Sequence, residues 1–224
     1  MKQFKQILLT GILMFAFKAY VFSQARKTHY ASARAQKQVT PPQRQQGSAQ
    51  LKAFQQLAAD ANVSFTFPQG FKELKAPNNE DVSFDYAMEL PGKEFEIWFR
   101  VRSLKENWAA YEKTTVSYAD RPDNPDSLYI AMGKAQATAF AGDNPILSRS
   151  IPANMVARYN GDAGRSYMIN LPDEALTKHY RYALLLTLQK DHTGSIMVVC
   201  FSNQRGPEFF KNIDKASNCI KFKP

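Results

Sequence analysis

The sequence has few of the residue types that hold metal ions or act as nucleophiles. Its 224 residues include two cysteines and three histidines, which are His29, His179 and His192. No carboxylate or nucleophile stands at a spacing that would support His179 or His192 in catalysis. We therefore expect no metal site, and we expect structural roles for these two histidines.

The signatures of common catalytic sites are also missing. The sequence contains no GxSxG, HExxH, GxGxxG or CxxC motif and no phosphate-binding loop of the GxxxxGK type. These absences lower the expectation of an enzyme without excluding one. We predict no cofactor.

No hydrophobic run is long enough to cross a bilayer. The longest, Ile7–Phe17, has eleven residues, whereas a membrane-spanning helix needs about 20. Two lysines precede this run, and Ser23-Gln24-Ala25 places small residues where signal peptidase prefers them. We expect residues 1–25 to be a signal peptide cleaved after Ala25, which makes the mature protein periplasmic or secreted, with no transmembrane segment. The alternative, an uncleaved anchor, is disfavoured by Lys18 inside any longer span.

Acidic residues are absent from the first 52 positions. The nine basic residues found there have no acidic counterpart, so the other 20 of the 29 basic residues balance all 20 acidic ones. The basic character therefore belongs to the leader and to residues 26–50, a Gln-rich segment that we predict to be a disordered linker. A basic arm at residues 26–52 is suited to weak contact with an anionic surface, while the balanced remainder argues against nucleic-acid binding.

The two cysteines, Cys200 and Cys219, allow one disulfide in an oxidising compartment. Closing the 18 intervening residues into a loop would stabilise the fold by about 3 kcal/mol. The alternative is a pair of buried thiols, because Cys200 lies in the apolar run IMVVCF. The sequence leaves both interpretations open.

Residues 51–224 are long enough for one domain, and its first half has clear patterns. Helical spacing predicts a helix at 48–61, and alternation predicts a strand at 63–67. The strongest strand signals lie at 82–90 and 95–101, on either side of Pro91-Gly92. They predict a hairpin whose loop extends beyond two residues.

The second half is predicted to hold three helices and two more hairpins. The helices are expected at 106–113, from a cap at Asp126 to Gly142, and from Pro207 onward. The hairpins are expected to pair 155–159 with 166–171 and 180–188 with 195–202. The runs LLLTL and IMVVCF are apolar on both faces, which predicts central strands covered on each side.

This order of helices and antiparallel strands predicts an α+β fold, with an antiparallel β-sheet sandwiched between helices. The pattern Phe-x-x-Pro-x-Gly-Phe at 65–71 and the closing Ile-Lys-Phe at 220–222 resemble the PsbP-like fold. The resemblance implies an interaction module rather than an enzyme, and it carries over no photosystem-binding or metal-binding motif. The alternative architecture is a cystatin-like or cone-shaped sheet around one helix.

The most chemically suggestive segment runs from Tyr159 to Tyr167. Asp162 and Arg165 flank glycines there, so the loop could present backbone amides and a guanidinium group to a carboxylate or phosphate. The alternative is a hairpin turn in which the Asp162 side chain hydrogen-bonds the backbone of that same turn. Trp98 stands among charged residues on a strand, where it is either covered by a helix or displayed for binding.

These features predict an exported, non-catalytic domain that binds a protein or a cell-envelope component. One alternative is a periplasmic hydrolase in which Asp162 and a second carboxylate act as acid and base. Another is a carrier of small apolar ligands with a pocket between helix and sheet. The candidate ligand-binding residues are Tyr159, Asp162, Arg165 and Trp98.

Overall fold

The computed structural model describes residues 47–80, 82–114 and 122–224. The predicted leader and nearly all of the predicted linker lie outside these residues. The described residues belong to one compact unit, assigned to Gln45–Pro224. No helix in this described part of the chain is long and apolar enough to span a membrane.

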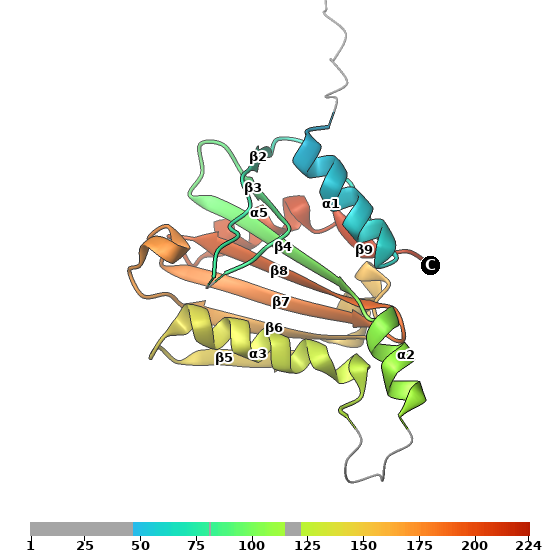
Figure 1. The fold of residues 1–224 in the computed structure, drawn as a ribbon. Helices are drawn as coiled ribbons and strands as arrows, with labels where there is room; N and C mark the ends of the chain where they lie inside the picture. Colours follow the sequence, from blue (N-terminus) through green and yellow to red (C-terminus); the bar gives the residue numbers. More distant parts are fainter. Residues whose placement is uncertain (1–46, 81, 115–121) are drawn as a thin grey trace, which may run out of the picture. The chain divides into compact units, whose positions relative to one another are not determined.

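A seven-stranded sheet organises the fold, with every neighbouring pair of strands antiparallel (Figure 1). Its strands, in spatial order, are β2 (Lys72–Leu74), β3 (Tyr86–Glu89), β4 (Phe95–Ser103), β8 (Gly194–Ser202), β7 (Tyr182–Lys190), β6 (Ala163–Asn170) and β5 (Ile146–Ser150). Two short strands, β1 (Val63–Phe65) and β9 (Ile220–Phe222), pair with each other apart from this sheet.

Helices cover both faces of the sheet. The α-helices are α1 (Ala49–Asp60), α2 (Lys105–Lys113), α3 (Leu128–Ala141), α4 (Ala153–Val156) and α5 (Pro207–Ala216). Single 3-10 turns are η2 (Pro125–Ser127), η3 (Ala157–Tyr159) and η4 (Ala175–Thr177).

The first helix forms as its sequence predicts. The Ser48 hydroxyl accepts a hydrogen bond from the Leu51 amide at 2.9 Å and so caps α1. Phe54 and Ala58, four residues apart, are buried, and the Phe54 ring stacks on Tyr86 of β3 with centroids 4.9 Å apart. This packing places α1 on the face formed by β3 and β4.

The opposite face of the sheet is covered by α3. Ala137, Phe140 and Ala141 are fully buried, and Phe140 lies against Trp98 and Phe201 with ring centroids 6.2 and 5.7 Å apart. Figure 1 shows α3 running along the β5–β6 side of the sheet. The predicted α+β fold, an antiparallel sheet between helices, is confirmed.

The two central hairpins are confirmed. β3 pairs with β4 around Pro91-Gly92, where Gly92 has φ 74° and the Lys93 amide bonds the Leu90 carbonyl at 3.0 Å. β7 pairs with β8, and all nine residues of β8 are buried. β7 differs from its prediction, because Leu184 and Leu186 on one of its faces are half-buried rather than covered.

The predicted strand at 155–159 is wrong. This segment forms α4 and η3, and the strand that pairs with β6 is β5, at 146–150. Pro152 stands at the N-cap of α4, where a missing amide donor costs nothing. Val156 and Tyr159 are three residues apart and therefore share a helical face, and Asn160 ends the segment with φ 52°.

Asp126 does not cap α3 as predicted. The preceding turn, η2, is capped by the Asn124 side chain, which accepts from the Asp126 amide at 2.8 Å. The Asp126 carboxylate instead accepts from the Trp108 indole and the His192 amide, both at 3.0 Å. It thereby ties the start of α3 to α2 and to the β7–β8 turn, and the His192 ring stacks on Trp108.

Cys200 and Cys219 are free and buried, so the disulfide that their spacing allows is not formed in this structure. Burial raises the pKa of the Cys200 thiol well above its usual value, and burial also raises the pKa of Cys219 to about 12. Both thiols therefore stay protonated in the folded chain at pH values where unfolded cysteine ionises.

We expect the chain to lose stability as the pH rises above about 9. A thiol whose pKa is raised by folding contributes its full stability below the unfolded pKa, and this stability is lost as the pH rises toward the folded pKa. Replacing both cysteines with alanine should reduce this loss of unfolding free energy at pH 10 by about 4 kcal/mol, about 2 kcal/mol for each thiol. Urea unfolding between pH 7 and pH 10, with a reductant present, measures this. Equal pH slopes for the two proteins would contradict it.

Candidate functional site

The structure does not bring Asp162 and Arg165 together. Asp162 is exposed, and its carboxylate accepts from the Asp191 amide at 2.8 Å, which joins the start of β6 to the β7–β8 turn. Arg165 lies on the α3 side of β6, the face it shares with Tyr167, and donates to the Ser148 hydroxyl at 3.3 Å. The two side chains therefore serve separate structural contacts.

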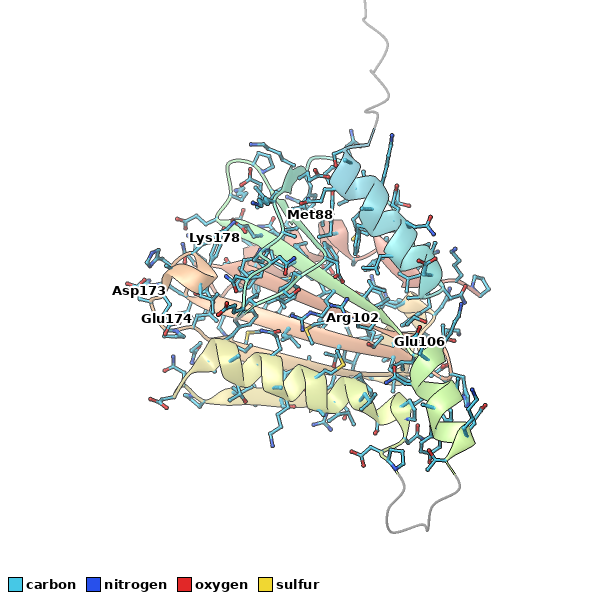
Figure 2. All side chains as sticks on the ribbon, viewed as in Figure 1. Met88, Arg102, Glu106, Asp173, Glu174 and Lys178 are labelled. Carbon is cyan, nitrogen blue, oxygen red and sulfur yellow. The ribbon has the colours of Figure 1, made fainter. Side chains whose placement is uncertain are left out.

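Trp98 is fully buried and is not displayed for binding. Its indole N–H donates to the Glu96 carboxylate at 3.1 Å, and Lys178 pairs with the same carboxylate at 2.8 Å. Lys178 comes from the β6–β7 connection, as do Asp173 and Glu174 (Figure 2). These contacts neutralise a carboxylate that is 6% exposed.

Tyr159 lies at the end of η3, where burial raises the pKa of its hydroxyl. It is half-buried and lines a groove of about 480 Å³ on the sheet face opposite α3. Of the four predicted ligand-binding residues, Tyr159 alone lines this groove. We call it the arginine-rimmed groove, lined by Leu147, Arg149, Ser150, Ile151, Pro152, Met155, Arg158, Tyr159, Ser166, Met168, Leu184, Leu186, Arg205, Phe210, Ile213, Asp214 and Ser217.

The floor of the groove consists of two rows of side chains that run across three strands. In the first row Leu147 of β5, Met168 of β6 and Leu184 of β7 are register partners. In the second row Arg149, Ser166 and Leu186 are register partners. Alternate residues of a strand share a face, so both rows lie on the same side of the sheet.

Short helical segments complete the lining of the groove. Met155 comes from α4, Tyr159 from η3, and Phe210 and Ile213 from α5. Leu147, Met155 and Phe210 are 50%, 46% and 46% exposed, which is unusual for large apolar side chains gathered in one place. The groove therefore offers a contiguous apolar surface to solvent.

The charges of the groove are unbalanced. Arg149, Arg158 and Arg205 line it together with one acidic residue, Asp214. Within the described part of the chain, none of these three arginines takes part in an ion pair. A ligand with carboxylate groups would therefore meet guanidinium donors that no protein carboxylate already neutralises.

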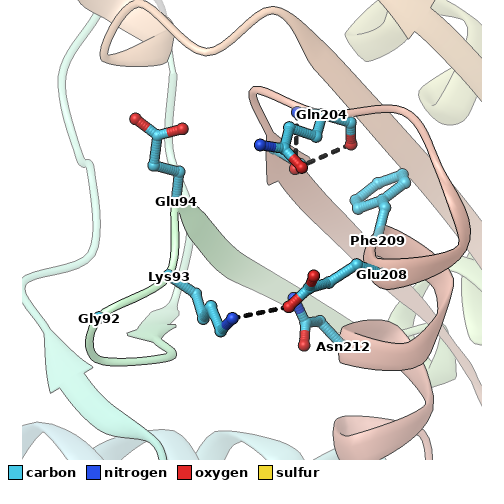
Figure 3. Close-up of a pocket in the computed structure, with 8 residues that line it drawn as sticks. Gly92, Lys93, Glu94, Gln204, Glu208, Phe209 and Asn212 are labelled. Atoms are coloured by element: carbon cyan, nitrogen blue, oxygen red, sulfur yellow. Dashed lines mark hydrogen bonds and ion pairs between the residues drawn. The ribbon is translucent and has the colours of Figure 1, made fainter.

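In two other hollows the main polar side chains are hydrogen-bonded or ion-paired within the chain. One, of about 270 Å³, lies between the β3–β4 turn and α5 (Figure 3). In it Lys93 pairs with Glu208 at 2.7 Å, and the Ser202 hydroxyl bonds the Gln204 backbone. The hydrogen bond from Lys93 lowers the pKa of the Glu208 carboxyl. These groups have partners within the chain and need no ligand.

The second hollow, of about 500 Å³, lies at the start of α1. Its carboxylate, Glu73, accepts from the Ser48 hydroxyl at 2.6 Å and from the Tyr86 hydroxyl at 2.8 Å. The bonds join α1 to β2 and β3, so a structural role accounts for this cluster. The arginine-rimmed groove combines exposed apolar side chains with arginines that form no ion pair with any of the described residues, and we take it as the candidate site.

Among known proteins, similarity to this chain is found in structure and not in sequence. No protein-family model and no curated protein matches the chain. Among solved structures, the chain is similar to the solution structure of cyanobacterial PsbP (CyanoP) from Synechocystis sp. PCC 6803. The match has 10% sequence identity and a TM-score of 0.37, and it covers 73% of this chain and 88% of that chain. The resemblance to the PsbP-like fold is loose, and it assigns no role to any residue.

Sequence reasoning missed most of this site. The sequence pattern predicts a fully covered strand for Leu184 and Leu186, and it predicts neither β5 nor the helical form of 153–159. One available signal was the run of apolar residues on both faces of β7, because such a strand either has two covers or exposes apolar surface. The spacing of Phe210 and Ile213 beside buried Phe209 was a second signal, since it makes the apolar stripe of α5 wider than one contact face needs.

Proposed function

We propose that this chain is an exported, non-catalytic binding module for a protein or a cell-envelope component, and that the arginine-rimmed groove is its binding surface. The observation that carries the proposal is the exposed apolar floor and walls beside three arginines that have no ion-pair partner within 47–80, 82–114 and 122–224. Aromatic, methionine and arginine side chains are enriched at interfaces because they combine large apolar area with directed hydrogen bonds.

The hydrolase alternative gains no support from the geometry. The Asp162 carboxylate, which a hydrolase of this kind would use, lies on the surface and accepts a hydrogen bond from the Asp191 backbone amide. The apolar-carrier alternative has one observation in its favour, because a groove of about 480 Å³ falls in the size range of small-molecule sites. The groove is lined in part by the edge strand β5, however, which suits an extended partner better than an enclosed small ligand.

Site-specific photo-crosslinking tests the proposal. A photoreactive benzoyl-phenylalanine replaces Phe210 in the groove or, as the matched control, Lys134 on the exposed side of α3. The full chain is expressed with its own leader in cells that make it naturally and is then irradiated. We expect discrete protein or envelope-polymer adducts from position 210 and none from position 134. Equal adducts from both positions, or none from either, would sink the proposal, and lipid-sized adducts would favour the carrier.

Charge reversal provides a second readout. Changing Arg149, Arg158 and Arg205 together to glutamate should weaken the position-210 adduct about tenfold or more, because an acidic partner would meet repulsion. The control carries the same change of charge on exposed lysines away from the groove: Lys105→Glu, Lys113→Glu and Lys134→Glu. Equal losses from both triple variants would show a general effect of charge and would contradict a role for the groove.

A further inference from the structure

The edge strand β5 borders the arginine-rimmed groove. Within the described residues β5 pairs with β6 on one side and with no strand on the other. Ser148, Arg149 and Ser150 are exposed along it. An edge strand of this kind presents a row of unpaired amide and carbonyl groups, which can hydrogen-bond another extended chain.

The register shows which backbone groups point outward. The Ile151 amide donates to the Gly164 carbonyl at 2.9 Å, one step beyond the pairing of Ser150 with Arg165. Hydrogen-bonded and non-bonded pairs alternate in an antiparallel ladder. Leu147 and Arg149 are therefore bonded to β6, and the backbone groups of Ile146, Ser148 and Ser150 point away from it.

The side chains of β5 connect this free edge to the groove. Leu147 and Arg149 lie on the groove face, and Ile146 on the α3 face packs against the core. A strand added beside β5 would therefore place alternate side chains next to Leu147 and Arg149, over the rim of the groove.

We propose that β5 accepts an extended segment of a protein partner as an additional strand, with an apolar side chain beside Leu147 and an acidic side chain two residues away, beside Arg149. This inference rests on the proposed function and specifies the recognition mode. Such strand addition draws affinity from main-chain hydrogen bonds and specificity from alternate side chains.

The charges select this occupant over two others. A second copy of the chain pairing through β5 would bring two arginine-rimmed grooves together, which costs repulsion. The chain's own residues 26–52 are basic and contain no acidic residue, so they do not complement the arginines. A partner segment with carboxylates does.

The length of the edge limits the segment. Pro145 and Pro152 flank the strand and its last paired residue, Ile151, and proline has no amide to donate. No proline interrupts 146–151. The partner strand would advance by about 3.4 Å per residue, as β5 does. Pairing along 146–151 therefore covers about five or six residues of the partner.

The main test replaces Ser148 with proline. This change removes one outward amide and no β5–β6 hydrogen bond, and proline is tolerated on an edge strand at such a position. Ser148→Ala is the matched control, because it also loses the bond from Arg165 to the Ser148 hydroxyl but keeps the amide. The probe is a library of random nine-residue peptides displayed on phage, selected against the full chain, and thermal melting checks that each variant folds.

Selection should enrich peptides that carry an acidic and an apolar residue two positions apart. Their affinity, measured by fluorescence anisotropy, should fall about tenfold or more on Ser148→Pro and stay within about twofold on Ser148→Ala. Should Ser148→Pro fail to fold, peptides with alternate backbone amides methylated serve the same purpose against the unmodified chain, and they should bind about tenfold more weakly.

The proposal is overturned if no peptide is enriched, if enriched peptides lack the spacing, or if neither proline nor amide methylation weakens binding. A fall in peptide affinity when Arg149, Arg158 and Arg205 are changed to glutamate, with no change in affinity on Ser148→Pro, would overturn strand addition and leave the groove as the binding surface. If position 210 gave no adduct in the chain that keeps its arginines, by contrast, the proposed function itself would be contradicted.

Discussion

Trp98→Ala is expected to lower the free energy of unfolding by about 4 kcal/mol. The side chain is fully buried, with ring centroids 4.3 Å from Phe201 and 5.4 Å from Phe84. Its removal leaves a large cavity between α3 and the sheet, and it also takes away the indole donor of the nearly buried Glu96 carboxylate. Urea unfolding followed by circular dichroism measures the loss.

Two controls separate the causes of this loss. Trp98→Phe keeps most of the ring packing and removes the donor, so it should cost clearly less than alanine. Trp108→Ala truncates the other tryptophan, which is half-buried between His192 and Tyr111, and should cost less than half as much. A loss below about 1.5 kcal/mol for Trp98→Ala would contradict the central role that we assign to this residue.

Gly194→Ala is expected to destabilise the fold by about 3 kcal/mol, although glycine-to-alanine changes in strands usually stabilise. Gly194 opens β8 opposite Ser103 of β4. An added Cβ would lie 2.7 Å from the Arg102 carbonyl oxygen and 3.3 Å from that of Ala61. Both obstacles are backbone atoms, so relief requires β8 to move away from β4 and from the end of α1.

The matched control for this substitution is Gly206→Ala. A Cβ there meets no atom within 4 Å, so the change should alter stability by less than about 0.5 kcal/mol. Thermal melting of the two variants beside the unmodified chain measures the difference. A Gly194→Ala variant as stable as the parent would show that β4 and β8 do not approach as closely as described.

The local patterns of the sequence predicted those elements whose signals are complete within a few residues. The capping Ser48 with Phe54 and Ala58 four residues apart predicted α1, and the alternation around Pro91-Gly92 predicted the β3–β4 hairpin. In both cases the structure agrees. Local prediction failed at 146–159, because an exposed edge strand needs few apolar residues and a one-turn helix is too short to show periodicity.

The sequence predicts that the chain has a binding surface, but it does not predict where in the fold this surface lies. Tyr159, which the sequence predicts as a ligand-binding residue, lines the groove, whereas Asp162, Arg165 and Trp98 serve hydrogen bonds and packing elsewhere. The sequence does not point to Arg149, Arg158 and Arg205, since three arginines far apart in sequence carry no local pattern. Their convergence follows from the β5–β6–β7 register and from the position of α5.

The sequence by itself determined the balanced charge of residues 53–224, the antiparallel α+β organisation and the helix and hairpin boundaries with strong local signals. Tertiary structure alone decided which apolar faces are covered. α3 seals one face of the sheet, while α1 and α5 leave the β5–β7 part of the other face open. Leu184 and Leu186 have the sequence pattern of core residues, and they form a groove floor because burial depends on what packs above a strand, which the strand's own residues do not encode.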